Sequence, residues 1–294
     1  MRHSFLIELL LWLVVLIWAG NYTIGKFGMR EFSPLLFTAL RFTIATPLIL
    51  LLLHAREGGL RFSRAALPRV ILVGVVGIAF YQTAFIAAVK YTTVATVSLA
   101  LGVSPIFTAL LGAALGREKL TRPVLAGCLT AFAGLFLVIS QSPGAPAFGL
   151  HTPIGDLLAL AAGLLWGLYP ILATPLLKTR SALWVTGHSS LAGTAVLLAL
   201  AAPELLAADW AAVTWAGWAS LLYAAVPVTV IALVGWYHAI EKIGANQVMI
   251  YMYLITPVAI TIAAFTIGEK ITLLQGIGAA VAMAGVFLAK RSSA

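Results

Sequence analysis

Ten apolar segments, each about twenty residues long, follow one another along this chain with only short polar or charged stretches between them. They cover approximately residues 5–24, 34–53, 69–89, 94–115, 123–140, 155–176, 183–202, 215–238, 247–267 and 273–290. A helix needs about 20 apolar residues to cross a bilayer core that is roughly 30 Å thick. Only 9% of the residues are charged, too few for the surface of a water-soluble domain. The sequence therefore predicts an all-α integral membrane protein with ten transmembrane helices.

Lysine and arginine are distributed unevenly between the two sides that these segments define. If the N-terminus is cytoplasmic, thirteen of the 18 Lys and Arg residues fall on the cytoplasmic side, four fall outside, and Arg41 lies within the second segment. Cytoplasmic loops carry an excess of these residues. We therefore expect both termini in the cytoplasm of a multi-pass protein of a cell membrane, most simply a bacterial inner membrane. The net charge of +9 is spread in short clusters that suit anionic lipid headgroups, not nucleic acid.

One sequence block occurs twice. Residues 104–121 read SPIFTALLGAALGREKLT, and residues 256–272 read TPVAITIAAFTIGEKIT. A shift of 151 positions aligns Glu118 with Glu269, and the same shift aligns AGLFL at 133–137 with AGVFL further on. The chain therefore reads as an internal duplication.

Each half of the duplication holds five segments. Because five is odd, the second half enters the membrane with the opposite orientation to the first. The sequence thus predicts two inverted five-helix repeats, residues 1–147 and 148–294. Inverted repeats are typical of secondary transporters.

The doubled block, with its proline, apolar run and Glu-Lys-apolar-Thr turn before a glycine-rich last segment, resembles the drug/metabolite transporter superfamily. The similarity is to its EamA-repeat exporters, and it covers essentially the whole chain. Within that family the chain is also similar to bacterial exporters of aromatic amino acids. The resemblance implies export of small organic metabolites through a central cavity between the halves. It places the family's final-turn glutamate at Glu118 and Glu269, where we expect it to fix helix ends.

Two prolines interrupt equivalent segments, Pro105 in the fourth and Pro257 in the ninth, each about ten residues into its helix. A proline inside a helix removes one backbone hydrogen bond and kinks the helix. A plain packing kink explains each proline equally well. Their pairing across the repeat favours a hinge or gate.

Aromatic and polar side chains within the segments are the candidates for substrate contact, since polar groups in hydrocarbon are costly unless they face the bundle interior. The candidate residues are Trp18, Asn21, Tyr22, Tyr81, Gln82, Ser98, Trp166, Tyr169, His188, Tyr251 and Tyr253. Hydrogen bonding between helices is the alternative role for any one of them. Together these rings suit planar or amphipathic cargo such as aromatic amino acids, although many drugs would satisfy the same lining. Trp236 and its neighbours fit an interfacial belt or an inner gate equally well.

All nine Asp and Glu residues fall near segment ends, so no carboxylate occupies the middle of a helix, where proton relays usually lie. His188 is the one titratable group of near-neutral pKa well inside a segment, and a structural hydrogen bond is its commoner role. This pattern favours facilitated diffusion or exchange over obligate proton coupling. Arg41 could snorkel outward or bind a backbone carbonyl. A direct contact with a substrate carboxylate is a further alternative.

Other functional classes lack their signatures. The single cysteine, Cys128, allows no intrachain disulfide, and no metal-ligand spacing occurs, so we expect neither metal nor cofactor. An intramembrane enzyme would need a catalytic pair or an HExxH motif, and none is present. We therefore expect a non-enzymatic transporter whose partners are a small-molecule substrate and the lipid bilayer. It could act as a monomer. Export of other metabolites or drugs remains the nearest alternative.

Overall fold

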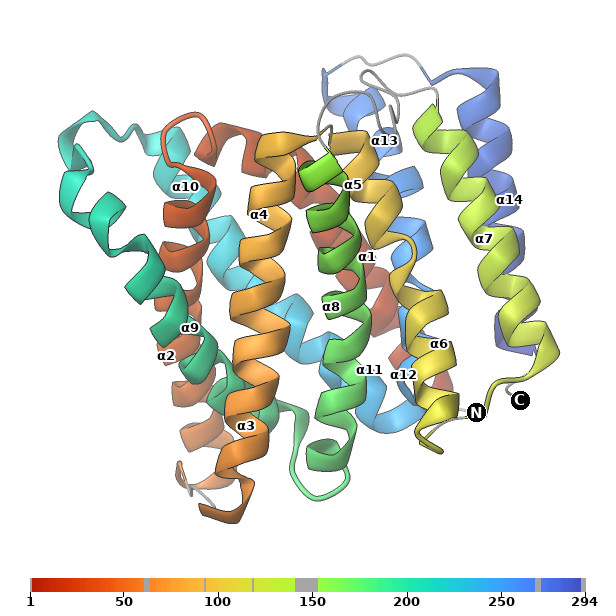
Figure 1. Ribbon diagram of the computed structural model, residues 1–294, viewed down its shortest axis with the longest axis horizontal. Helices are drawn as coiled ribbons and strands as arrows, with labels where there is room; N and C mark the ends of the chain where they lie inside the picture. Colours follow the sequence, from red (N-terminus) through yellow and green to blue (C-terminus); the bar gives the residue numbers. More distant parts are fainter. Residues whose placement is uncertain are drawn as a thin grey trace. The chain divides into compact units, whose positions relative to one another are not determined.

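A computed structural model describes residues 2–60, 64–92, 94–117, 119–140, 153–267 and 271–291. Within these ranges the regular elements are all helical (Figure 1). They are α1 (Arg2–Gly28), α2 (Pro34–Glu57), η1 (Arg64–Ala66), α3 (Leu67–Gly74), η2 (Val75–Phe80), α4 (Tyr81–Tyr91), α5 (Val94–Leu101), α6 (Ser104–Ala114), α7 (Arg122–Ser140), α8 (Pro153–Leu177), α9 (Ala182–Ala207), η3 (Trp210–Ala212), α10 (Trp215–Tyr223), η4 (Ala224–Leu233), α11 (Val234–Ile243), α12 (Ala245–Met249), α13 (Met252–Ile267) and α14 (Leu273–Arg291).

The predicted membrane segments are confirmed. Among the described residues, nine continuous helical stretches are long and apolar enough to cross a bilayer, and a shorter apolar helix at Leu273–Ala289 corresponds to the tenth segment. Several stretches combine elements: the third runs through η1, α3, η2 and part of α4, and the eighth through α10, η4 and α11. The chain is an all-α protein of apolar helices, as the sequence predicts.

The helices form two compact units. The first unit contains Met1–Thr83 and Leu172–Glu241, and the second contains Ala84–Ile171 and Lys242–Ala294. Each unit therefore takes helices from both halves of the chain. The organisation into domains 1–147 and 148–294 stays a prediction about the repeat.

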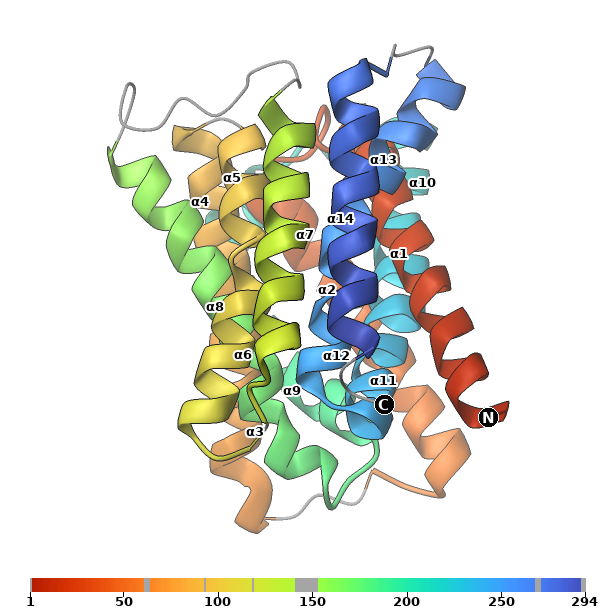
Figure 2. The same ribbon diagram turned by 90° about the vertical axis from the view of Figure 1, so that its right-hand side faces the viewer.

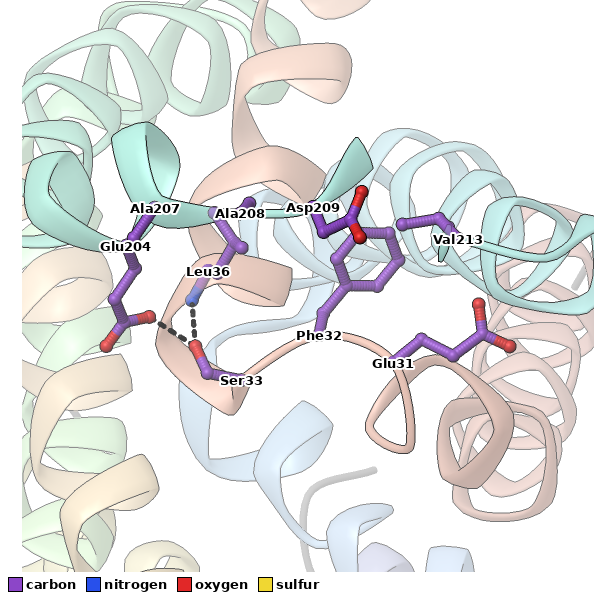
Figure 3. A pocket seen from close by; sticks show the side chains of 9 residues that line it. All are labelled: Glu31, Phe32, Ser33, Leu36, Glu204, Ala207, Ala208, Asp209 and Val213. Carbon is purple, nitrogen blue, oxygen red and sulfur yellow. Dashed lines mark hydrogen bonds between the residues drawn. The ribbon is translucent and has the colours of Figure 1, made fainter. Parts of the chain in front are cut away.

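In the first unit, α2 and α9 pack against each other as an antiparallel pair (Figure 1). Near their middles, the hydroxyls of Thr46 and Thr194 lie 2.9 Å apart. At the start of α2, Ser33 caps the helix by accepting a hydrogen bond from the Leu36 N–H at 3.1 Å, and its hydroxyl donates to Glu204 of α9. Figure 3 shows Ser33 between these two partners.

The opposite end of the α2–α9 pair repeats this arrangement with the roles exchanged. Ser181 caps α9 by accepting from the Trp184 N–H at 3.0 Å, and its hydroxyl donates to Glu57 at the end of α2. A capping serine of each helix is thus bound to a glutamate of the other. The two helices, which occupy equivalent places in the two halves of the sequence, are fastened reciprocally.

This reciprocity predicts equal effects at the two ends. Ser33→Ala and Ser181→Ala should each lower the free energy of unfolding by about 1 kcal/mol, because each removes an N-cap acceptor. Thermal or chemical unfolding in detergent measures the loss. Ser140→Ala is the matched control, since the Ser140 hydroxyl donates to the Leu137 carbonyl of its own helix and its loss should change little. A loss at one end alone would contradict the reciprocal arrangement.

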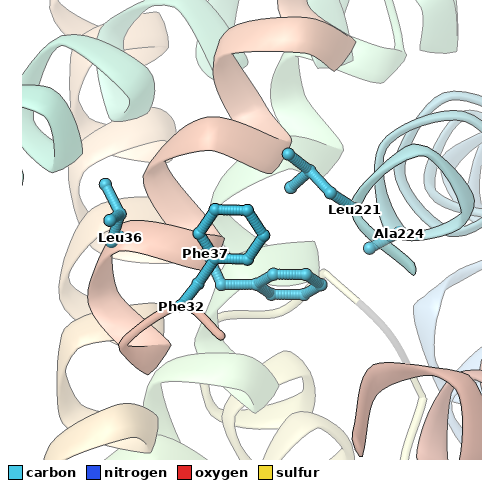
Figure 4. Packing of buried hydrophobic residues seen from close by; sticks show 5 residues of the cluster. All are labelled: Phe32, Leu36, Phe37, Leu221 and Ala224. Atoms are coloured by element: carbon cyan, nitrogen blue, oxygen red, sulfur yellow. The ribbon is translucent and has the colours of Figure 1, made fainter. Parts of the chain in front are cut away.

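An aromatic cluster joins α2 to α10 in the first unit. Phe32, Leu36 and Phe37 are buried against Leu221 and Ala224, as Figure 4 shows. The rings of Phe32 and Phe37 have centroids 6.2 Å apart. This contact fixes the start of α2 and gives the unit an apolar core.

Helix α1 is tied to the same region of the first unit by Ser220. The Ser220 hydroxyl accepts from the Gly28 N–H at 3.1 Å and donates to the Ile24 carbonyl at 2.8 Å. A methyl group added at Gly28 would lie 2.4 Å from the Phe37 ring. The close approach of α1 to α2 therefore depends on glycine at this position.

In the second unit, α7 and α14 lie side by side in both views and run antiparallel (Figures 1 and 2). A Cβ added at Gly134 would lie 2.3 Å from the Ala282 nitrogen, and one added at Gly285 would lie 2.3 Å from the Ala131 nitrogen. The shift of 151 positions that relates the two halves converts one of these contacts into the other. The α7–α14 contact is thus reciprocal, like that of α2 and α9.

Candidate functional site

Two helices of the first unit widen into π-helix at equivalent positions. The π-helical segment η2 spans Val75–Phe80, and η4 spans Ala224–Leu233. Shifting the first by 151 positions gives 226–231, which falls inside the second. π-helix is rare and is frequently found at functional sites, so its paired occurrence marks these two helices.

Proline explains one of the two π segments. Pro227 lies inside η4 and has no N–H to complete the ordinary helical ladder. Within the same segment, the Thr229 hydroxyl donates to the Ala224 carbonyl at 2.8 Å. The segment η2 contains no proline. Gly74 directly precedes its apolar run, and Gly77 lies within that run. The two segments therefore have the same helix geometry, but the proline that explains it in η4 has no counterpart in η2.

The second unit contains two interrupted helices, also in equivalent halves. The fourth predicted segment breaks between α5 and α6, at Gly102 and Val103, and the ninth breaks between α12 and α13, at Ile250 and Tyr251. Interrupted membrane helices leave backbone groups available to a ligand where they line a cavity. The structure thus has irregular backbone in four of its membrane helices.

The predicted hinge prolines both lie beyond these breaks. Pro105 is in the first turn of α6, where proline costs little because its missing N–H has no partner in any case. Pro257 lies inside α13, six residues after the break at Tyr251. Pro105 therefore begins a helix and does not kink a continuous one. The role of either proline in gating stays a prediction.

Trp18 is placed by the π segment of the first unit. Its indole N–H donates to the Val228 carbonyl of η4 at 3.2 Å. Its ring lies 4.9 Å from that of Trp236 in α11, with 43° between the planes. Trp236 is only 1% exposed, so it belongs to the interior of the unit and not to a lipid-facing belt.

Other predicted residues of the first unit lie on α1 and at the start of α4. Asn21 is half-buried, and its Oδ1 is enclosed with no hydrogen-bond partner among the described residues. Tyr81 and Gln82 are half-buried directly after η2. The side chain of Tyr22 lies outside the described residues, although its backbone belongs to α1.

His188 is held within its own helix. It is buried in α9, its Nδ1 lies 2.9 Å from the Trp184 carbonyl, and its ring lies 4.3 Å from the Trp184 ring. These contacts fit the structural hydrogen bond that the sequence favoured.

In the second unit, Trp166 and Tyr169 form a buried aromatic pair on α8, with ring centroids 5.9 Å apart. The Thr108 hydroxyl of α6 donates to the Gly167 carbonyl at 2.8 Å. A Cβ added at Gly167 would lie 2.8 Å from the Ser104 carbonyl oxygen. The pair is therefore fixed directly against α6, the helix that follows the break.

Tyr251 and Tyr253 lie at and just beyond the other break and are both buried. The Tyr253 hydroxyl has no hydrogen-bond partner among the described residues. Ser98 is half-buried on α5. Glu118 and Glu269 lie outside the described residues.

A small cavity of about 270 Å³ opens where α2 begins and α9 ends (Figure 3). Three carboxylates, of Glu31, Glu204 and Asp209, line it beside the Phe32 ring. Each already binds a neighbour: Glu31 accepts from the Thr214 N–H at 2.8 Å, and Asp209 from the Ala211 N–H at 3.2 Å. Glu204 accepts from Ser33. These groups fix helix ends, and within the described ranges no cluster of three or more His, Cys, Asp or Glu side chains could hold a metal.

Sequence reasoning missed the π segments and left the place of Trp236 open. Proline at Pro227 was a visible signal for η4, because it lies well inside an apolar segment. Nothing in the apolar run of η2 indicates a wider helix. The burial of Trp236 follows from its contact with Trp18, which no local pattern reveals.

Comparison with known proteins supports both the fold and its duplication. Residues 5–140 and 153–291 each match the profile of the EamA-like transporter family. An uncharacterized transporter of Archaeoglobus fulgidus is 29% identical over 96% of both chains. A Streptantibioticus cattleyicolor protein named "Probable terminal-alkyne amino-acid exporter" is 28% identical over 95% of this chain and 91% of its own.

Two further comparisons extend over almost the full length. A Salmonella typhimurium protein named "Probable amino-acid metabolite efflux pump" is 28% identical over 94% of this chain and 92% of its own. A solved structure titled "Crystal structure of protein" superposes with a TM-score of 0.82, covering 98% of this chain and 97% of that chain. At 19% identity, this last likeness concerns the fold alone.

Proposed function

Since this chain belongs to the EamA-like transporter family, a family of multi-pass membrane transporters, we propose that it exports small amphipathic metabolites, aromatic amino acids among them, by alternating access through a central cavity. The observation that carries the proposal is the pairing of irregular helices. π segments and helix breaks occur at equivalent places in both halves of the chain. Irregular membrane helices in paired positions are the usual location of transporter sites.

The reciprocal helix pairs favour an inverted repeat. Helices α2 and α9 occupy equivalent places in the two halves and run in opposite directions, and so do α7 and α14. Equivalent helices that run antiparallel are what an odd number of spans per half produces. Alternating access follows naturally from such a plan, because exchanging the conformations of the two halves exchanges the open side.

The choice of cargo is supported by chemistry and by two relatives. The Streptantibioticus cattleyicolor and Salmonella typhimurium proteins carry names that refer to amino-acid export or efflux. The Trp18–Trp236 and Trp166–Tyr169 pairs supply flat apolar faces with polar edges. Such faces suit aromatic side chains through offset stacking. Drugs or other amphipathic metabolites are the alternative cargo.

The remaining features of the proposal follow the sequence. The substrate contacts are assigned to the eleven residues named above, and gating to Pro105 and Pro257. The protein lies in the bacterial inner membrane with both termini cytoplasmic, and it works by facilitated diffusion or exchange. It acts as a transporter and not as an enzyme, with a small molecule and the bilayer as its partners.

Flux of radiolabelled amino acids into proteoliposomes tests this proposal. Phe, Trp and Tyr are compared with Leu, Thr and Glu, with and without an imposed pH gradient. We expect saturable aromatic flux, at least about tenfold faster than that of Glu, and independent of the gradient. Equal flux of all six amino acids, or none in liposomes with folded protein, would refute aromatic export. Gradient-driven flux would refute facilitated diffusion.

A substitution refines this test at the aromatic pair. Trp18→Phe keeps a ring but reduces its face, and should weaken aromatic uptake two- to tenfold, as an aromatic contact is worth about 0.5–1.5 kcal/mol. The matched control is Trp215→Phe, because Trp215 is 81% exposed and should not affect uptake. The half-saturating concentration of Trp is the quantity to compare.

A further inference from the structure

Arg41 is a cation inside a membrane helix, and no ion pair among the described residues involves it. It is the eighth residue of α2, about 10 Å beyond the helix start. Its guanidinium carbon lies 4.8 Å from the centre of the Phe42 ring, and its Nε is fully enclosed. Within the described ranges this Nε has no hydrogen-bond partner. A guanidinium carries five N–H donors, which require acceptors when buried.

Five carboxylates of the first unit, all except that of Glu8, are engaged elsewhere. Their partners are Thr214 for Glu31, Ser181 for Glu57, Ser33 for Glu204, the Ala211 N–H for Asp209, and the Ala182 N–H and His238 for Glu241. All of these contacts lie at helix ends. A charge buried in a membrane helix is costly unless it is paired. The missing partner of Arg41 is therefore not supplied by these acids.

Tyr81, the first residue of α4, belongs to the same unit as Arg41 and lies at a similar depth. The register of the helices agrees with this. Thr46 of α2 meets α9 at Thr194, and Ile78 of η2 meets α9 at Gly193. Thr46 and Ile78 thus lie at about the same depth. At 1.5 Å per residue, Arg41 lies about 7 Å from Thr46 and Tyr81 about 5 Å from Ile78, both toward the same end of the unit. The π segment η2 thus ends directly before Tyr81, at a depth close to that of Arg41.

We propose that the Arg41 guanidinium binds the carboxylate of the transported molecule, at the level of Tyr81. This inference rests on the proposed function and narrows its substrate class to molecules with an anionic group. A guanidinium presents two parallel N–H donors to a carboxylate, which an ammonium cannot do. The bound carboxylate supplies both the charge and the acceptors that Arg41 lacks.

The test compares L-phenylalanine with L-phenylalaninamide, which differs only in having no carboxylate. Uptake of both is measured in proteoliposomes with the unaltered chain, Arg41→Gln, Arg41→Lys and Arg56→Gln. Arg56 lies exposed in the last turn of the same helix, so its replacement is the matched control. We expect Arg41→Gln to raise the half-saturating concentration of phenylalanine by about ten- to a hundredfold and to leave that of the amide unchanged. Arg41→Lys should fall between, and Arg56→Gln should change neither.

Folding of the variants gives an independent readout. An unpaired buried cation destabilises the empty protein, so Arg41→Gln should unfold at the same temperature or higher. A fall of several degrees would show that Arg41 holds the fold together and would overturn the proposal. An equal change for phenylalanine and its amide would overturn it as well.

A separate experiment keeps this inference distinct from the proposed function. If the unaltered chain transports neither probe, export of aromatic amino acids fails, and binding is measured instead. Phenylacetate should then raise the unfolding temperature of the unaltered chain, whereas phenylacetamide should not, and Arg41→Gln should abolish the difference. Equal behaviour of the two ligands would overturn the role of Arg41 without reference to transport.

Discussion

Replacing Gly134 or Gly285 by valine is expected to destabilise the protein more than any substitution on the lipid-facing side of the same helices. Even a single Cβ at these positions would lie 2.3 Å from a backbone nitrogen of the facing helix. Backbone atoms cannot move aside as a flexible side chain can, so α7 and α14 must separate. Overpacking costs about 1–3 kcal/mol where neighbours can adjust, and this contact should reach or exceed that range.

Thermal unfolding and the yield of monodisperse protein measure the effect. The two variants should lose equal stability, because the contacts of Gly134 and Gly285 are reciprocal. Gly276→Ala in α14 is the matched control, since a Cβ there meets nothing within 4 Å. It should be neutral or slightly stabilising, as alanine favours helix over glycine. Unequal losses, or full tolerance of valine, would contradict the close packing of α7 on α14.

Pro227→Ala should slow transport at least about tenfold while leaving the protein as stable as before or more so, because proline disfavours a helix by about 3 kcal/mol relative to alanine. The new N–H can complete the ordinary helical ladder and remove the π segment. A π turn contains about one residue more than an α turn, so converting η4 to α-helix rotates the helix that follows it by about 100°. Trp236 would then leave its contact with Trp18, which is 4.9 Å away in the present arrangement.

The measurements are initial flux and unfolding temperature, made on the same preparations. Pro47→Ala provides the comparison, because Pro47 lies in the regular helix α2 and is exposed. It should raise stability without slowing flux. Slower flux in both variants would point to a general cost of stiffening, and unchanged flux in Pro227→Ala would remove the π segment from the mechanism.

The membrane helices could be predicted because their signal is local. A run such as Pro34–Glu57 is apolar over its whole length, and hydropathy alone identifies it. The repeat was equally visible, since Gly134 and Gly285 occupy corresponding places in similar sequences. What these glycines contact was not visible, because a contact between helices far apart in the sequence leaves no trace in either one.

The irregular backbone was predicted only in part. Pro105 and Pro257 drew attention to the right helices, but the breaks lie before them, at Gly102–Val103 and Ile250–Tyr251. Helix geometry there depends on packing, for example on Gly167 of α8, whose missing side chain admits the Ser104 carbonyl. Propensity is a weak guide when tertiary contacts decide.

The surroundings of the charged side chains were the other feature that the sequence did not reveal. Arg41 looked from the sequence like a residue that could extend outward or bind a carbonyl. The structure encloses its Nε and gives it no acceptor among the described residues, which no pattern of neighbours could have indicated. Glu31, Glu57 and Glu204 lie at helix ends, as the sequence indicated, yet their partners at Thr214, Ser181 and Ser33 required three-dimensional information.

The reciprocal contact of α7 with α14 has a consequence for ancestry. Contacts that interchange under a twofold operation are those of a symmetric homodimer. If the two halves descend from one ancestral segment, that ancestor paired with its own copy through Gly134 and its equivalent, Gly285. The copies faced each other antiparallel, so the ancestral gene product had to insert into the membrane both ways round. Joining the two copies in one gene then freed each to acquire its own orientation signals and its own residues.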